Sequence, residues 1–218
     1  MKLDEVKALL KDENPQKRMS AITALRQYEE TVAVPLLASQ LKDPEFIIRS
    51  FASTGLGYKR TSEGFTALVD VLQCDRDPNV RSEAANSLAK YGKQALPYLR
   101  KAAEIDDHWL LQMSILSSVA EFDCPDELYI LCMRALEHSD AVVQCLGLEH
   151  LGYLRDSKRH DDAQEELLIW AESENWAFRK QAALTLRQFN GLFTQNALVR
   201  LMQDEDYRVV AATLEGLI

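Results

Sequence analysis

The sequence is poor in the residues that punctuate β-structure: of 218 residues, eight are glycine and six are proline. A β-sandwich with many tight turns needs more of both. No low-complexity tract is present, and no apolar run approaches the roughly 20 residues of a membrane-spanning helix. The first residues, MKLDEVKALLKDEN, lack the apolar centre of a signal peptide. We therefore expect a cytoplasmic protein without a transmembrane segment.

Cysteine and histidine are also scarce, and neither shows a site-forming spacing. The four cysteines include no CxxC pair, and no two of the four histidines stand four residues apart. Paired spacings of this kind are typical of disulfide frameworks and zinc sites. The sequence contains no nucleophile or phosphate-binding constellation either. We expect reduced, mostly packed thiols, no metal, no cofactor and no catalytic residue.

Basic residues are too few for a nucleic-acid protein. The net charge is -9, with 15 Lys and Arg against 13 Asp and Glu in residues 1–100, and 10 against 21 in residues 101–218. General binding to a phosphate backbone needs a basic face that releases counterions. The acidic second half is typical of a solvated surface, and no nucleic-acid partner is expected.

What the sequence does contain is a repeat. Seven anchor positions follow one another at separations of 31, 32, 31, 32, 35 and 31 residues: Arg18, Arg49, Arg81, Gln112, Gln144, Arg179 and Val210. Four residues before the anchor, five of the seven repeats carry Asn or Asp, the side chains that best cap a helix start. Proline follows at Pro15 and Pro78, where a helix loses nothing by its missing N–H. Each anchor therefore lies in the first turns of a helix.

The apolar residues around each anchor share one face of that helix. Positions -1, +3 and +7 relative to the anchor are apolar or small in nearly every repeat, and +7 is Leu25, Leu56, Leu88, Val119, Leu151, Leu186 and Leu217. These offsets match a 3.6-residue period. The pattern predicts a buried stripe that is repeated seven times.

A second amphipathic segment precedes each capped helix, as in EGFTALVDVLQC and DELYILCMRALEH. Two-helix units that cannot bury their apolar faces alone stack on their neighbours. We therefore predict an all-α fold, a right-handed α-solenoid of about seven repeats in one domain over residues 1–218. The predicted repeats are 1–29, 30–60, 61–92, 93–123, 124–155, 156–190 and 191–218. The charged link RDSKRHDD is expected to be a longer loop and a slight hinge.

The repeated pattern D-P-x-V-R-x-x-A-x-x-x-L resembles HEAT repeats, in particular the short type named after phycobilisome lyases. DPNVRSEAANSLAKYG and NWAFRKQAALTLRQFN match it best, and weaker copies cover essentially the whole chain. The resemblance implies a cyanobacterial source and a scaffold or assembly role. Similar proteins attach bilin chromophores to antenna proteins, help dismantle phycobilisomes or act as assembly factors. No catalytic motif is carried over, because the matching residues serve packing and capping.

The second helix of each repeat is expected to line a concave face, with offsets +2, +5, +6 and +9 exposed. Two i,i+7 pairs there, Phe51 with Tyr58 and Leu146 with Tyr153, interrupt a mostly polar surface. An aromatic pair beside cations is typical of interface hot spots. The candidate partner-binding residues are Phe51, Tyr58, Lys59, Arg60, Lys90, Leu146, Glu149, His150 and Tyr153. Two interpretations stay open: these side chains contact a partner, or they pack against adjacent repeats.

Other polar groups have simpler explanations. Glu149 and His150 are adjacent and point about 100° apart on a helix, so a solvated histidine is favoured over an acid–base pair. DDHW, residues 106–109, is explained by helix capping, and Cys124 by an ordinary loop before Pro125. The arginines among the anchors adjoin Asp12, Asp43 and Asp77, which predicts a structural Asp–Arg ladder rather than a basic stripe.

The two ends differ. The first helix carries one apolar stripe, Leu3, Val6, Leu9 and Leu10, as a solvent-facing cap should, while the last segment, VVAATLEGLI, is apolar without a polar cap. That end is either a docking and self-association surface or a frayed terminus. We predict a non-catalytic adaptor that binds another protein, such as a phycobiliprotein or a photosynthetic assembly component. The alternative is a bilin lyase subunit that handles an open-chain tetrapyrrole.

Overall fold

The side chains that the sequence places at helix starts do cap helices in the computed structural model, which describes residues 1–215. Asn14, Asp77, Asp140, Asn175 and Asp206 each accept a hydrogen bond from the backbone N–H two residues further on. Within the described residues the chain forms fourteen α-helices and three short 3-10 helices, with no strand. The predicted all-α fold of consecutive helical pairs is confirmed.

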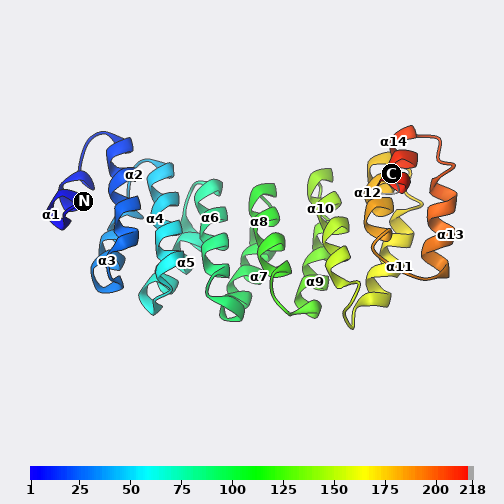
Figure 1. Cartoon of the computed structure of the whole chain (residues 1–218), viewed down its shortest axis with the longest axis horizontal. Coiled ribbons are helices and arrows are strands. Elements are labelled where there is room, and N and C mark those ends of the chain that lie inside the picture. The colour runs from blue at the N-terminus through cyan, green and yellow to red at the C-terminus, as the bar shows by residue number, and fades with distance from the viewer. Residues whose placement is uncertain (216–218) are drawn as a thin grey trace. The chain divides into compact units, whose positions relative to one another are not determined.

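The helices fall into two compact units, residues 1–118 and 119–218. Figure 1 shows the hairpins of each unit following one another in chain order. Unit 1 contains α1 (Leu3–Leu9), α2 (Pro15–Ala24), η1 (Leu25–Gln27), α3 (Glu30–Gln40), α4 (Phe46–Lys59), α5 (Ser62–Cys74), α6 (Pro78–Ala89), η2 (Gly92–Ala95), α7 (Leu96–Ile105) and most of α8 (Trp109–Ala120). Unit 2 contains α9 (Pro125–Leu136), α10 (Ala141–Leu151), η3 (Gly152–Leu154), α11 (His160–Trp170), α12 (Trp176–Leu186), α13 (Leu192–Leu201) and α14 (Tyr207–Leu214).

Each unit is built in two layers. The even-numbered helices, called second helices below, pack side by side, as α4 does against α2 and α6 and as α12 does against α10 and α14. The odd-numbered first helices form the other layer, where α5 contacts α3 and α7, and α11 contacts α13. None of the helices in residues 1–215 combines the length and apolar character of a membrane span.

The predicted stripe is the core. At position +7 the side chains of Leu25, Leu56, Leu88, Val119, Leu151 and Leu186 have no exposed surface. Positions -1 and +3 are buried as well, except that Lys17 is exposed and Phe178 is half-buried, with its ring 4.9 Å from that of Trp170. Leu217 lies outside the described residues. Each apolar column therefore fills the space between the two layers.

The anchor arginines connect one hairpin to the next. Arg18 Nη2 donates to Asp43 Oδ1 at 3.0 Å, Arg49 Nε to Asp75 Oδ2 at 2.7 Å, Arg81 Nε to Asp106 Oδ2 at 2.6 Å, and Arg179 Nε to Asp204 Oδ2 at 2.7 Å. In each pair the aspartate belongs to the turn of the following repeat. Nη1 of each arginine also donates to a main-chain carbonyl in its own turn. One guanidinium thus ties two successive turns together.

The predicted Asp–Arg ladder is confirmed, but two of its acids were assigned wrongly. Asp43 is a ladder partner. Asp77 instead caps α6, and the Asp12 carboxylate accepts from Lys17 and from the Asn14 amide. The ladder acids stand six residues before the anchors, where their second oxygen can accept from the amide two residues on, as Asp75 does from Asp77 at 2.9 Å. Sequence adjacency alone does not distinguish this position from the cap two residues later.

Where an anchor is not arginine, its ladder partner also changes. Gln112 and Gln144 stand in for arginine, and the ladder positions of the repeats that follow them are His138 and Ser173. Both glutamines still donate to carbonyls of their own hairpin, Gln112 to Asp106 O at 2.7 Å and Gln144 to Leu136 O at 2.9 Å. His138 and Ser173 still accept from the amide two residues on. In these two repeats the hydrogen bonds within each hairpin are kept, whereas both the arginine and the aspartate of the ion pair between hairpins are replaced.

The charged link RDSKRHDD is fixed to its own unit. Asp126, near the start of α9, pairs with Lys158 and with Arg159 Nε at 2.8 Å, and Arg159 also pairs with Asp162 at 2.8 Å. The hydrogen bond from Lys158, and after it the one from Arg159, lowers the pKa of Asp126. The segment expected to be a slight hinge is therefore tied to α9.

Replacing Leu88 with alanine tests whether the +7 column is core. The side chain is fully buried in unit 1, so the substitution should lower the free energy of unfolding by about 2–5 kcal/mol. Leu192, whose side chain is 68% exposed, provides the control, and Leu192→Ala should cost about 0.5 kcal/mol or less. Urea denaturation measures both; equal losses would show that the column is not the core.

Candidate functional site

The residues nine positions after each anchor form the most exposed column of the second helices. Gln27, Tyr58, Glu121, Tyr153 and Gln188 are exposed there, and Lys90 is half-buried. These positions lie at the C-terminal ends of the second helices, beyond their packed middle parts. The prediction that offset +9 is exposed is confirmed at five of six positions.

Offset +6 was wrongly predicted to be exposed. Ser87, Ser118, His150 and Thr185 occupy it and are all buried. The reason is the close approach of neighbouring second helices: a Cβ added to Gly57 on α4 would lie 2.8 Å from the Cβ of Ser87 on α6. At Ser87 this offset therefore faces a neighbouring second helix instead of solvent.

A group of cations surrounds Tyr58 at the end of α4. The Tyr58 side chain is 50% exposed; the Arg26 guanidinium carbon lies 4.6 Å from its ring centroid and Lys90 Nζ lies 5.4 Å from it. Arg26 comes from the preceding hairpin and Lys90 from the following one. Contacts at these distances are cation–π interactions. The structure thus brings together the candidate residues Tyr58 and Lys90, and Arg26, at offset +8, is a member that the repeat pattern missed.

Lys59 and Arg60 follow Tyr58 directly in the sequence, at the end of α4. Lys59 Nζ donates to the carbonyls of Arg26, at 3.1 Å, and of Tyr28. Arg60 ends α4 in the left-handed conformation with φ 53°, and its amide donates to Leu56 O at 3.2 Å. Cations at a helix C-terminus are stabilised by the carbonyl ends that lie there. Arg26, Tyr58, Lys59, Arg60 and Lys90 are called the Tyr58 cluster below.

Phe51 lies on α4 two turns before Tyr58 and is half-buried. Between them, Thr54 Oγ1 donates to Glu83 Oε1 of α6 at 2.7 Å. Seven residues of helix span about 10 Å, so Phe51 shares the face of Tyr58 without joining its cation group. The face is therefore apolar at Phe51, polar at Thr54 and Glu83, and basic at the helix end.

The other predicted residues belong to unit 2. Leu146 is half-buried and Glu149 is exposed on α10, and Tyr153 is 58% exposed in η3. His150 is only 5% exposed; its Nδ1 lies 2.9 Å from Leu146 O and its ring centroid 5.4 Å from that of Tyr153. The expectation of a solvated histidine is wrong, because His150 occupies the buried offset +6. Burial lowers its pKa below the usual 6.5.

The side chains of Asp106 and His108, which were expected to cap a helix start, do form capping hydrogen bonds. Asp106 accepts from the His108 amide at 3.0 Å and pairs with Arg81, and His108 Nδ1 accepts from the Leu110 amide at 3.3 Å. Cys132 is buried, which raises its pKa, Cys124 and Cys145 are half-buried, and Cys74 is exposed. In residues 1–215, no cluster of three or more His, Cys, Asp or Glu is placed to hold a metal ion.

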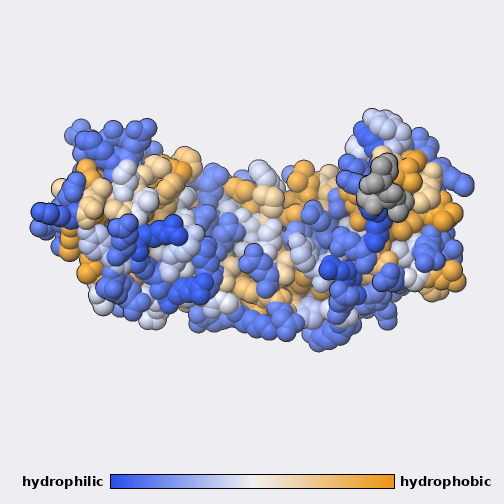
Figure 2. Space-filling view, in the orientation of Figure 1, coloured by the Kyte–Doolittle hydropathy of each residue, from blue (hydrophilic) through white to orange (hydrophobic). Residues whose placement is uncertain are grey.

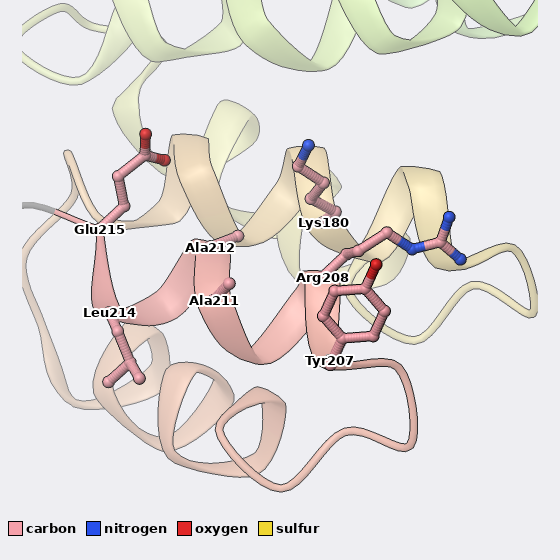
Figure 3. Close-up of a pocket in the computed structure, with 7 residues that line it drawn as sticks. All are labelled: Lys180, Tyr207, Arg208, Ala211, Ala212, Leu214 and Glu215. Atoms are coloured by element: carbon pink, nitrogen blue, oxygen red, sulfur yellow. The ribbon is translucent and has the colours of Figure 1, made fainter.

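A depression of about 650 Å³ lies beside α14 in unit 2 (Figure 3). It is lined by Lys180, Tyr207, Arg208, Ala211, Ala212, Leu214 and Glu215. The Arg208 guanidinium carbon lies 3.2 Å from the Trp176 ring centroid, and Tyr207 is 78% exposed. Figure 2 shows hydrophobic surface at this end of the unit. The predicted docking segment VVAATLEGLI contributes Ala211, Ala212, Leu214 and Glu215 to this lining, and its last three residues lie outside the described residues.

Comparison with known proteins identifies the family. The model of HEAT repeats matches residues 34–120 and 129–218. The chain belongs to the HEAT-repeat family. No curated protein has significant sequence similarity to it.

Solved structures resemble the HEAT-repeat chain in fold. YibA of Escherichia coli is 17% identical with a TM-score of 0.66, and the match covers 97% of this chain and 80% of YibA. The complex of CpcE and CpcF of phycocyanin lyase from Nostoc gives 20% identity and a TM-score of 0.56, covering 98% and 94%. An engineered protein gives 18% and 0.53, covering 96% of this chain and 66% of its own. At these identities the likeness concerns the fold.

The buried His150 predicts a pH dependence of stability. Because its pKa in the folded chain is below its unfolded value of about 6.5, the unfolded chain binds the proton more tightly, and stability is lost as pH falls below about 6.5. The loss is at most about 1.4 kcal/mol per pH unit. Urea denaturation at pH 7.5 and 5.0 should show a larger drop for the unaltered protein than for His150→Gln. Equal drops would mean that His150 is not held neutral.

Proposed function

We propose that this protein is a non-catalytic HEAT-repeat adaptor that binds another protein through the exposed face of its second helices. The observation that carries the proposal is the Tyr58 cluster, in which Arg26 and Lys90 from the neighbouring hairpins lie over an exposed tyrosine ring, and Lys59 and Arg60 follow that tyrosine at the end of α4. Aromatic and arginine side chains are enriched in the hot spots of protein interfaces. The partner we propose is a phycobiliprotein or a photosynthetic assembly component in the cytoplasm of a cyanobacterium.

The architecture supports this role. A repeat array buries its motif residues between hairpins and leaves one side chain per repeat at the same helix end. In this chain offset +9 supplies that row, and Phe51 extends it along α4. In unit 2, Leu146, Glu149 and Tyr153 are the proposed binding residues, and the buried His150 would hold the Tyr153 ring in place. The depression beside α14 remains our proposed place of self-association.

The double substitution Phe51→Ala with Tyr58→Ala tests the adaptor. Both side chains are partly exposed, so we expect capture of a partner from cell lysate to fall about tenfold or more, with little change in Tm. Phe46→Ala with Tyr98→Ala is the matched control, because these exposed rings lie on the start of α4 and on α7. Unchanged capture together with a lower Tm would show that Phe51 and Tyr58 serve packing, and the site assignment would fail.

A bilin lyase subunit is the second candidate, and the fold similarity to the CpcE–CpcF complex of phycocyanin lyase favours it. The candidate contacts for the propionates and ring nitrogens of an open-chain tetrapyrrole are Lys59, Arg60 and Glu149. Lys59 and Arg60 belong to unit 1 and Glu149 to unit 2. Mixing the purified protein with phycocyanobilin should then shift the pigment's absorption band, and an unshifted band would reject this candidate.

A further inference from the structure

We propose that the Tyr58 cluster recognises an acidic segment of the protein partner, in which Asp or Glu carboxylates pair with Arg26 and Arg60 around the Tyr58 ring. This inference rests on the proposed adaptor function and names the chemistry of its partner. It starts from the two arginines and from what surrounds them.

Arg26 and Arg60 differ from the ladder arginines. Both are exposed, and within residues 1–215 no carboxylate pairs with either guanidinium. By contrast Arg49 and Arg179 are nearly buried and each pairs with an aspartate. A guanidinium presents five N–H donors in a fork that matches a carboxylate. The N–H donors of these two guanidinium groups are therefore available to carboxylates of a partner.

The lysines of the cluster add charge without neutralising it. Lys90 Nζ donates to the carbonyl of Asn86 at 3.2 Å, and Lys59 Nζ uses the carbonyls of Arg26 and Tyr28. Carbonyl oxygens carry no formal charge, so these contacts leave the positive charges of both lysines uncompensated. In a chain whose net charge is -9, such a local excess of cations favours an anionic partner over other surfaces.

The Tyr58 ring favours an acidic protein segment over a simple anion, because it provides an apolar surface for side chains of the partner. It is half exposed, and Arg26 and Lys90 approach it from the hairpins on either side. Carboxylates that reach the arginines would bring the methylene groups of their Glu or Asp side chains against this ring. The half-buried Phe51, two turns away on the same helix, gives a neighbouring apolar residue of the partner a place to pack.

An acidic protein segment fits better than a nucleic acid. Unit 1 carries 16 Lys and Arg against 16 Asp and Glu. A phosphate backbone is bound by an extended basic track whose counterions are released along its length. The Tyr58 cluster is confined to the ends of three helices, which matches a few carboxylates in sequence.

Unit 2 provides an internal comparison. Tyr153 is the equivalent residue of its repeat and is similarly exposed, at 58% against 50% for Tyr58. Its ring contacts His150, which is buried, and in the described residues no cation lies over it. Unit 2 has 9 Lys and Arg against 18 Asp and Glu. The same column therefore carries a tyrosine with cations in one unit and without them in the other.

The test uses the full chain and fluorescein-labelled octaglutamate, with octaglutamine as the uncharged peptide, in fluorescence anisotropy at 20 mM salt. Octaglutamate should bind and octaglutamine should not. Arg26→Gln with Arg60→Gln should weaken binding about tenfold, as two exposed charge pairs allow, and Tyr58→Ala should weaken it as well. Arg100→Gln with Arg200→Gln changes the net charge equally, at arginines already paired with glutamate, and should alter affinity less than twofold, as should Tyr98→Ala at an exposed tyrosine outside the cluster.

Three results would overturn the inference. The first is octaglutamate binding that is equal for the unaltered protein and Arg26→Gln with Arg60→Gln. The second is tighter binding of a 20-residue oligothymidine that the same variant abolishes, which would assign the cluster to nucleic acid. The third is a dimer of the full chain, measured by sedimentation, that the variant dissociates, which would assign it to the acidic surface of a second copy.

The outcome is separable from that of the adaptor itself. If octaglutamate fails to bind while partner capture still depends on Phe51 and Tyr58, the acidic chemistry is wrong and the adaptor stands. If capture is also independent of both rings, the adaptor proposal fails with it.

Discussion

The fold depends on how one hairpin is joined to the next, and in four repeats that junction is a nearly buried arginine. Its guanidinium donates to carbonyls of its own turn and to an aspartate of the following turn, and that aspartate also accepts from a backbone amide. For Asp75, burial alone would raise the pKa, but the hydrogen bonds from Arg49 and from the Asp77 amide outweigh it and lower the pKa. Leucines at offset +7 are fully buried in the core between the two layers. The ion pair orients successive turns, and the leucine column supplies the burial that stabilises the stack.

The periodic features could be predicted because every repeat states them again. The caps, the +7 leucines and the arginine anchors recur at fixed spacing. The pattern can therefore be recognised even where a single repeat departs from it. The failures concern features that depend on the distance between neighbouring helices. Offset +6 looks exposed on a single helix, yet Ser87 meets Gly57 of the next helix and His150 is buried at the same place. The ladder acid was confused with the cap two residues later, because both are aspartates in one turn.

The proposed function depends on positions that the repeat pattern does not fix. The motif residues of a HEAT repeat are used for packing and capping, so they say little about the partner. Offset +9 varies along the chain, from Gln27 to Tyr58, Lys90 and Glu121. Arg26, which contacts the Tyr58 ring, stands one residue outside that column, and no repeat position marks it. Such a site is formed by three hairpins together, so it can be recognised only from their three-dimensional arrangement.

The most direct test of the ladder is a double-mutant cycle that copies the chain's own replacements, with Arg49→Gln, Asp75→Ser and the double variant. Glutamine and serine stand at the corresponding positions Gln144 and Ser173, where both members of the pair are absent together. Urea denaturation should show that each single substitution is costly and that the double costs little more, a coupling of about 1.5 kcal/mol or more. Additive single losses, with coupling under about 0.5 kcal/mol, would contradict the claim that this ion pair joins successive hairpins.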